Sequence, residues 1–349
     1  MDLSPFPADV GVAIVSHNNR GKIGATLASL DRAGCAQEQM LVVDVASTDG
    51  LADWLRTAYP RVSVRRMASN DGPNPGRNLA LRESPYPFVF LMDSDVQVRP
   101  DTVQRLHAAM AADGTVKIGS PLVVHLDDAD RIQYGGTRLH FICEAINPWM
   151  DRTLAERGLS PLDIGVASAN GLLIDRNAAI EIGLFDERYF MGKDDGDFTH
   201  RMRVAGHRIL ELPEALVLHQ SRPRSTWLFY YQIRNRWHFM LKNYELRTLI
   251  TIAPCLLVHE PLQLLVLHIK GHGGAYWKAV AGVLAMLPSL PGDRALVRGI
   301  RKLPDGELLY ADALIVRGDL AGGGIARAAK NAYERFLRGY WALARVVLK

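Results

Sequence analysis

An unbroken apolar run at residues 87–92 leads directly into the acidic triplet Asp93-Ser94-Asp95. A strand without polar alternation is typical of a parallel sheet that is buried on both faces. Ligands bind at the carboxyl ends of such strands. The sequence therefore predicts that Asp93 and Asp95 lie on the rim of a crevice in an α/β fold.

Two carboxylates that are one residue apart repel each other unless a cation or a set of donors holds them. Hard oxygen ligands suit Mg²⁺ or Mn²⁺, and these ions often take phosphate oxygens as further ligands. Our first hypothesis is therefore a metal–diphosphate site at Asp93 and Asp95. The alternative is a solvated acidic turn, because Asp and Ser favour turns.

Strand and helix signals alternate through the first half of the chain. Strands are predicted at 11–16, 40–44, 62–64 and 87–92, with apolar residues at helical spacing between them. This alternation predicts a mostly parallel sheet with helices on both faces. Right-handed crossovers would bring the loops after the first, second and fourth strands to one edge.

The middle of the chain has a different pattern. Strands are predicted at 118–126, 137–142, 171–174, 209–212 and 215–218, the last two joined by Pro213. A helix is predicted from Thr199 to Ala205, because Gly206 follows as a stop signal. We expect an α+β extension that continues the same sheet.

The chain becomes helical from about Trp227. Residues 249–269 are strongly apolar, but Pro254, Glu260 and Pro261 interrupt them, so a clean membrane span is not expected. Residues 325–347 are amphipathic and basic, which suits contact with an anionic membrane. Docking of this helix on the protein core is the alternative. For the aromatic and basic helix at 227–244 and the apolar segments after Leu249, a homodimer interface is the alternative to membrane contact.

Composition adds bounds on the class of protein. The 349 residues carry a net charge of +4, which fits a phosphorylated substrate or an anionic membrane surface; no nucleic-acid partner is expected. Cys35, Cys143 and Cys255 are far apart and odd in number, which favours a reducing compartment. No signal peptide is seen at 1–5, so we expect a cytoplasmic protein, with peripheral contact to the inner face of the cell membrane as an option.

Two further loops hold candidate ligand-binding residues. Asp44 ends the second strand, where it could accept a hydrogen bond from a nucleobase; capping of the next helix is the alternative, and Asp49 suits that role better. The Gly-rich loop at 70–78 opens a helix, where amide groups and Arg77 favour an anion. A simple turn is the alternative there.

A second acidic segment contains Asp194, Asp195 and Asp197. Asp197 suits the N-terminus of the following helix. The adjacent carboxylates Asp194 and Asp195 can raise each other's pKa, which suits a general base. His219 closes a strand and is either a metal or phosphate contact or a structural histidine.

Taken in order, these segments resemble the family 2 glycosyltransferases of GT-A fold. The resemblance rests on five motifs between Val10 and Tyr244, which lie at 12–18, 43–50, 70–78, 93–95 and 183–198. Arg234-Asn235-Arg236 is similar to the bacterial rhamnosyltransferase-like branch. The resemblance implies a GT-A domain at 1–245, with a nucleotide-sugar half at about 1–125 and an acceptor half at about 126–245. Residues 246–349 would then form a helical region that is membrane-associated or oligomerising.

The resemblance also implies an inverting transferase that moves a sugar from a UDP-, dTDP- or GDP-linked donor to a glycan or lipid-linked acceptor. It implies Asp195 as the base, with Asp194 beside it. The implied donor residues are Ser16, Asn18, Asp44, Ser47, Arg77 and Asp93; the metal residues are Asp95, Asp93 and His219, with Mg²⁺ or Mn²⁺; and the acceptor residues are Gly171, Asp194, Arg234 and Trp237.

Two positions depart from the family pattern. Val45 stands where Asn is usual after Asp44, and Asp194 replaces the usual Glu of the acceptor motif. Three rival functions are a glycoside hydrolase, a sugar nucleotidyltransferase and a non-catalytic scaffold of a glycan assembly complex. A hydrolase leaves Asp44 and Arg77 unexplained, a nucleotidyltransferase needs a Gly-rich basic loop after the first strand, and a scaffold needs none of the acidic residues.

Overall fold

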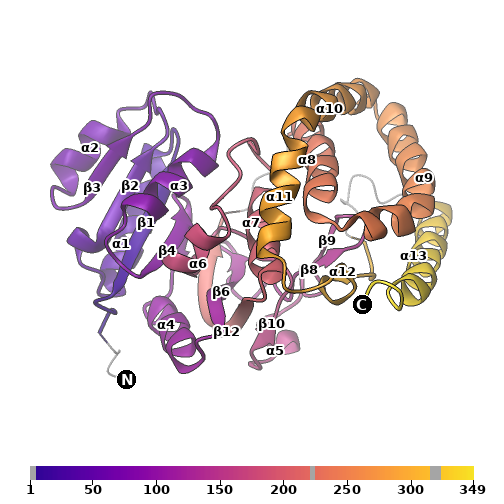
Figure 1. The fold of residues 1–349 in the computed structure, drawn as a ribbon. Coiled ribbons are helices and arrows are strands. Elements are labelled where there is room, and N and C mark those ends of the chain that lie inside the picture. Colours follow the sequence, from indigo (N-terminus) through magenta and orange to yellow (C-terminus); the bar gives the residue numbers. More distant parts are fainter. Residues whose placement is uncertain (1–4, 221–224, 315–323) are drawn as a thin grey trace. The chain divides into compact units, whose positions relative to one another are not determined.

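The computed structural model describes residues 5–220, 225–314 and 324–349. The chain forms two compact units (Figure 1). The first unit comprises residues 1–136, 149–202 and 207–223, and the second comprises 137–148, 203–206 and 224–349. The predicted boundary at residue 245 therefore falls one helix later than the main division near residue 224.

A ten-stranded sheet forms the centre of the first unit, in the order β10-β12-β6-β11-β4-β1-β2-β3, with β5 beside β12 and β7 beside β6. Its strands are β1 (Val10–Ser16), β2 (Met40–Asp44), β3 (Ser63–Arg66), β4 (Phe88–Asp93), β5 (Val96–Val98), β6 (Val116–His125), β7 (Ile132–Tyr134), β10 (Leu162–Asp163), β11 (Leu172–Asp175) and β12 (Arg208–His219). The strands from β3 to β4 are parallel, as expected. Beyond β4 the sheet is mixed, because β11 runs antiparallel to both of its neighbours.

Strand β12 differs from the sequence prediction of two short strands. It is continuous across Pro213, and its pairing with β6 shifts register between Leu212 and Leu216. A bulge of this kind accommodates a proline that cannot donate to the ladder. The bulge keeps His219 in the same strand, at the register position opposite His125.

Helices lie on both faces of this sheet (Figure 1). They are α1 (Arg20–Arg32), α2 (Leu51–Ala58), α3 (Pro73–Glu83), α4 (Thr102–Ala112), α5 (Leu154–Arg157), α6 (Arg176–Glu181) and α7 (Asp194–Val204), with a short 3-10 turn at Gln37–Gln39. The prediction that α7 begins at Thr199 was wrong by five residues. Asp194, Asp195 and Asp197 occupy its first turn, where the helix dipole favours negative charge.

Helix α3 packs unusually close to the sheet because Gly76 faces it. A side chain at Gly76 would lie 3.2 to 3.3 Å from Val43, Val15 and Val45. Gly72 precedes the helix with φ +94°, and a Cβ atom there would lie 2.6 Å from the carbonyl oxygen of Phe190. The two glycines let α3 lie between the strand ends and the segment around Phe190.

The second unit is mainly helical (Figure 1). It contains α8 (Leu228–Asn243), α9 (Leu246–Ile269), α10 (Gly273–Met286), a 3-10 turn at Leu287–Ser289, α11 (Leu290–Ile300), α12 (Asp305–Leu308) and α13 (Gly324–Ala344), with a small sheet in the order β13 (Leu309–Tyr310), β8 (Arg138–His140) and β9 (Ala145–Ile146). Helix α9 runs through Pro254 and Pro261, which lie in the apolar stretch at 249–269.

Within the described ranges, residues 246–269 and 273–300 are long and apolar enough to span a membrane, by length and composition alone. Glu260 lies inside the first of them, yet it is held by an ion pair with Arg236 of α8. Trp237 and Tyr276 also donate to Glu260, at 3.1 and 2.8 Å. The acidic residue is thus satisfied by its neighbours within the unit.

We predict that Gly72→Ala destabilises the first unit, because alanine is strained at φ +94° and its Cβ would meet the Phe190 carbonyl. The expected loss is about 2 kcal/mol or more, measured by urea or thermal unfolding. Gly114→Ala is the matched control, since nothing lies within 4 Å of a Cβ there. Equal unfolding midpoints for the two variants would contradict the prediction.

Candidate active site

The carboxyl ends of three neighbouring strands bring three of the predicted residues to one edge of the sheet. In the pairing of β1 with β2, Ser16 is opposite Asp44, and in the pairing of β1 with β4, Val15 is opposite Asp93. The chain order reverses at β1, since β2 lies on one side of it and β4 on the other. Such a switch point is where open α/β sheets form their ligand crevice.

The turns after β1 and β2 are linked to each other. The amide of Asn18 donates to Ser47 Oγ at 2.9 Å, and Asn18 Oδ1 accepts from the amide of Thr48 at 2.7 Å. Asn18 and Ala46 both have positive φ, a strained state for residues other than glycine. Two predicted donor residues, Asn18 and Ser47, therefore form one rigid double turn. Strain of this kind is concentrated at functional sites in proteins.

Asp44 is fully buried, and both of its carboxylate oxygens have partners. The amide of Ser47 donates to Oδ1 at 2.9 Å, and Arg66 donates to Oδ2 at 3.0 Å. Arg66 ends β3 opposite Asp44 and is half exposed. Asp44 thus shapes the turn, while Arg66, which the sequence analysis missed, presents charge at the same edge. The position of Arg66 at the end of the strand next to Asp44 could have identified it.

Ser16 adds an unsatisfied polar atom to this edge. Its hydroxyl is buried and has no hydrogen-bond partner within the described ranges. Buried polar atoms without partners are rare in proteins and call for an explanation, such as a ligand or water. Asp49, predicted as a helix cap, accepts from the first amides of α1 and α2, those of Arg20 and Leu51.

Asp95 and His219 lie side by side at the end of β12. Nε2 of His219 is 3.8 Å from Asp95 Oδ1, and Nδ1 is 2.7 Å from Gln133 Oε1. Because an amide oxygen only accepts, Nδ1 carries the proton, which leaves the Nε2 lone pair directed to the Asp95 side in neutral imidazole. A partner that fixes the tautomer in this way is typical of metal-binding histidines.

This pair fits a divalent cation that also takes phosphate oxygens, since Mg²⁺ and Mn²⁺ use few protein carboxylates beside a bound phosphate. A cluster of three or more His, Cys, Asp or Glu side chains arranged for a metal is not found in the described residues. Asp93, the third predicted metal residue, accepts from Arg77 at 3.2 Å. Burial raises the pKa of Asp93, and the charge of Arg77 opposes that shift.

Arg77 connects the two acidic segments. Nη2 donates to Asp93 and Nη1 donates to Asp194 at 2.7 Å, while the guanidinium is almost completely buried. Nη1 also donates to Asn74 at 3.1 Å. The residue predicted to contact phosphate is thus held between two carboxylates, 16 and 117 residues away in sequence. Contact with phosphate stays a prediction.

Two asparagines of α3 hold the second acidic segment in place. Asn74 donates to the carbonyls of Asp186 and Tyr189, both at 3.0 Å. Asn78 donates to the carbonyl of Phe185 and accepts from its amide, both at 2.9 Å. Asn74, Arg77 and Asn78 share one face of α3, since they are three and four residues apart. The sequence analysis did not assign a role to either asparagine.

The adjacent carboxylates Asp194 and Asp195 lie in different environments. Asp194 is buried against Arg77, whereas Asp195 is partly exposed. Burial and the charge of Asp194 raise the pKa of Asp195 to about 6, although Arg77 and the amides of Gly196 and Ala169 oppose the shift. Lys193, just before the pair, has φ +65°. A carboxylate poised near neutral pH is suited to accept a proton.

Asp197 is structural, as the sequence analysis preferred. It is fully buried and pairs with Arg201 at 2.9 Å. Arg201 also donates to the carbonyls of Ile182 and Leu184. This network ties α7 to the segment that leads into Asp194.

The four predicted acceptor residues do not all belong to one unit. Gly171 precedes β11 and is closely packed, since a Cβ there would lie 3.2 Å from Phe90 and Val217. Arg234 and Trp237 belong to the second unit. Arg234 lies over the rings of Tyr230 and Tyr231, and Trp237 donates to Glu260. Their roles in acceptor binding stay predictions.

The sequence profile of "Glycosyl transferase family 2" matches residues 11–182, which span the double turn, α3 and the first acidic motif. The chain carries a family 2 glycosyltransferase domain. The matched region includes Ser16, Asp44 and Asp93, which lie together at the carboxyl ends of neighbouring strands. The expected GT-A fold, its helical C-terminal region and the transferase class are confirmed.

Curated relatives are similar over most of the glycosyltransferase chain. An N-acetylglucosaminyl-diphospho-decaprenol L-rhamnosyltransferase of Mycobacterium tuberculosis is 25% identical over 291 residues, which cover 72% of this chain and 94% of the relative. The dTDP-rhamnosyl transferase RfbF of Shigella flexneri is 21% identical over 254 residues, covering 68% and 81%. The resemblance to a bacterial rhamnosyltransferase-like branch is therefore confirmed.

Solved structures support the fold. TarS of S. aureus is similar with a TM-score of 0.54 and 16% identity, covering 96% of this chain and 91% of that one. The mannosyltransferase PcManGT of Pyrobaculum calidifontis, solved with GDP-Man and Mn²⁺, gives a TM-score of 0.50 and 17% identity, covering 99% and 89%.

We predict that Arg77→Met unfolds the first unit more easily, because it leaves Asp93 and Asp194 without their shared cation. Breaking a buried pair costs about 3–5 kcal/mol. Arg82→Met on the same helix is the control, since Arg82 is 59% exposed and pairs loosely with Glu187 at 3.6 Å. Urea unfolding of both variants tests this, and a similar loss for Arg82→Met would refute the special role of Arg77.

Proposed function

We propose that this glycosyltransferase is an inverting, metal-assisted enzyme in which Asp195 is the general base. The observation that carries the proposal is the unequal pair Asp194 and Asp195. Asp194 is buried in an ion pair with Arg77, while Asp195 is partly exposed with a pKa of about 6. Arg77 also joins this pair to Asp93 at the strand edge, where a nucleotide would bind.

In the proposed reaction, Asp195 accepts the proton of an acceptor hydroxyl as its oxygen attacks the anomeric carbon of the donor sugar. The bond to the nucleoside diphosphate breaks on the opposite face, so the configuration inverts. A divalent cation bound by Asp95 and His219 would supply positive charge for the leaving diphosphate. Arg66 is half exposed at the same edge, where it pairs with Asp44 and could also contact a donor phosphate.

Names of the relatives narrow the proposed substrates. Both bacterial relatives transfer a rhamnosyl group, and one is named for a dTDP-linked donor. Among UDP-, dTDP- and GDP-linked donors we therefore favour a dTDP-linked deoxyhexose. The mycobacterial relative is named for a sugar on a polyprenyl diphosphate, which favours a lipid-linked glycan as acceptor here. Val45 after Asp44 leaves the nucleobase contact to be tested.

A lipid-linked acceptor would require peripheral contact with a membrane, and the second unit offers apolar side chains for it. Leu257, Ile269 and Leu343 are 74 to 78% exposed. Residues 225–349 hold 17 Lys and Arg but only 8 Asp and Glu, which favours an anionic membrane at the cytoplasmic face. A homodimer covering these side chains is the alternative, and sedimentation without lipid distinguishes the two.

We predict that Asp195→Asn lowers kcat by about 10²–10⁴-fold, because the amide cannot accept the proton. Wild-type kcat/KM should rise with pH through an apparent pKa of about 6, since Asp195 acts in its deprotonated form. The variant should lose this acidic limb. Asp53→Asn on exposed α2 is the control and should keep full activity. Near-normal turnover of Asp195→Asn would reject the base assignment.

We also predict that Asp95→Asn and His219→Ala weaken Mn²⁺-dependent binding of dTDP, measured by calorimetry with Mn²⁺ and with EDTA. Removing one ligand should cost at least about tenfold in affinity. His107→Ala is the control, because His107 lies on α4 and pairs with Asp9 instead. Undiminished Mn²⁺-dependent binding in both site variants would refute the metal role.

A further inference from the structure

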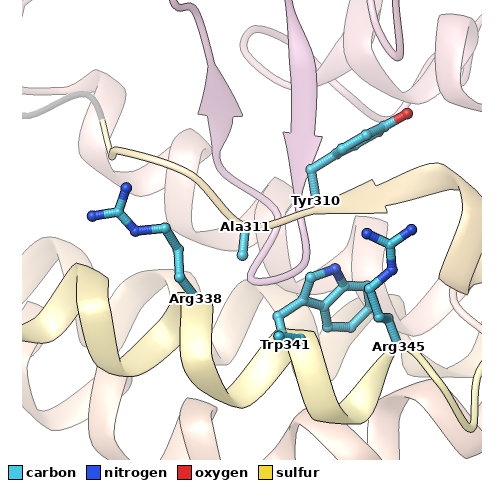
Figure 2. A pocket seen from close by; sticks show the side chains of 6 residues that line it. Tyr310, Ala311, Arg338, Trp341 and Arg345 are labelled. Atoms are coloured by element: carbon cyan, nitrogen blue, oxygen red, sulfur yellow. The ribbon is translucent and has the colours of Figure 1, made fainter.

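We propose that the second unit contains a binding site for a phosphate group, separate from the transferase site. The site is a cavity of about 380 Å³ between β13 and α13. It is lined by Tyr310, Ala311, Arg338, Trp341, Ala342 and Arg345 (Figure 2). The proposal goes beyond the transferase function, because none of these residues belongs to the first unit.

Two arginines give the cavity its charge. Arg338 lies on α13 and Arg345 follows one residue after its end, and both line the cavity. Figure 2 shows their guanidinium groups on opposite sides of Trp341. Arg338 has only a loose contact with Asp312, at 3.7 Å between half-exposed side chains. Arg345 has no ion pair with any residue that the structure describes. Guanidinium groups are suited to phosphate, which they can bind through two parallel hydrogen bonds.

Trp341 supplies the observation that points to a ligand. Its side chain is only 3% exposed, and its Nε1 atom is buried without a hydrogen-bond partner among the described residues. The indole is stacked on Phe141, with 4.9 Å between ring centroids and an 8° angle between planes. In Figure 2 the nitrogen is turned toward the Tyr310–Ala311 strand, which forms the other wall of the cavity.

A buried indole N–H that is fixed by stacking cannot turn to find another acceptor, so an acceptor brought by a ligand would remove its desolvation cost. The opposite wall is also fixed, because Tyr310 pairs with His140 in the small sheet and its carbonyl accepts from the amide of Phe141 at 2.9 Å. The cavity thus offers two cations and one neutral donor in a rigid frame. That set suits a phosphate monoester or diester.

The surroundings favour a phosphate carried by a lipid over a free phosphate ion. Phe336 and Leu343 are seven residues apart on α13 and are 46 and 78% exposed. They lie on the face of α13 opposite Arg338. An apolar face opposite a basic face is typical of a helix that lies in the headgroup region of a bilayer. We therefore infer that the arginines hold a lipid headgroup phosphate while the apolar side chains enter the bilayer surface.

The first experiment uses the indole N–H signals of the six tryptophans in a ¹H–¹⁵N spectrum of the full chain. Trp341→Phe identifies the signal of Trp341 by its disappearance. Titration of the wild type with inorganic phosphate should shift that signal saturably and leave the other five nearly unchanged. Absence of a saturable shift at Trp341 would overturn the proposal.

The second experiment separates the two sources of phosphate by flotation with vesicles of phosphatidylglycerol or of phosphatidylcholine. Arg338→Gln with Arg345→Gln should weaken binding to phosphatidylglycerol at least tenfold, and Trp341→Phe should weaken it severalfold. Arg335→Gln is the control, since this exposed arginine lies on the same helix but does not line the cavity. Near-wild-type binding of Arg335→Gln with loss in the double variant supports the proposal.

If Arg335→Gln weakened vesicle binding as much as either cavity variant, overall charge would explain the binding. That result would overturn the proposed site. A saturable shift with inorganic phosphate, without preference for phosphatidylglycerol, would keep the anion site and overturn the lipid source. Donor-sugar transfer to a soluble acceptor should be unaffected in all of these variants. Failure of the phosphate site is therefore distinguishable from failure of the transferase mechanism.

Discussion

The arrangement of the proposed transferase site depends on the ion pairs made by the guanidinium of Arg77. It lies between Asp93, at the end of a central strand, and Asp194, in the first turn of α7. Without a cation between them, two buried carboxylates from remote segments would repel each other. Arg77 can occupy this position only because Gly76 allows α3 to approach the strands closely. The close packing at Gly76 and the ion pairs of Arg77 therefore both determine the position of α3.

The same pairing divides the two adjacent acidic residues into different roles. Asp194 is buried in an ion pair with Arg77, so its carboxylate helps to hold the fold. Asp195 is partly exposed, and the negative charge of Asp194 helps to raise the pKa of Asp195 to about 6. The sequence alone does not reveal which of the two aspartates forms the ion pair, because the partner, Arg77, is 117 residues away from Asp194. The assignment of Asp195 as base gains a physical reason only from this contact.

Local patterns in the sequence were sufficient for the parts of the site that depend on single strands. Unbroken apolar runs located the ends of β2 and β4, and hence the shared edge of Asp44 and Asp93. Contacts between remote segments could not be predicted in this way. The pairing of Arg66 with Asp44 needs the register of β3, and the roles of Asn74 and Asn78 need the fold of residues 185–190. Pro213 led to a wrong prediction of two strands, since β12 accommodates it in a bulge and continues as one strand.

The ion pair inside the apolar helices bears on how the second unit could meet a membrane. Arg236 is almost fully buried, and its partner Glu260 also accepts from Trp237 and Tyr276, so α8, α9 and α10 share one polar cluster. Separating α9 from its neighbours to cross a bilayer would leave buried charges without partners, which is costly. Contact through exposed side chains such as Leu257 keeps the cluster intact. If the second unit contacts a membrane as proposed, the cost of burying unpaired charges favours contact at the bilayer surface over a span.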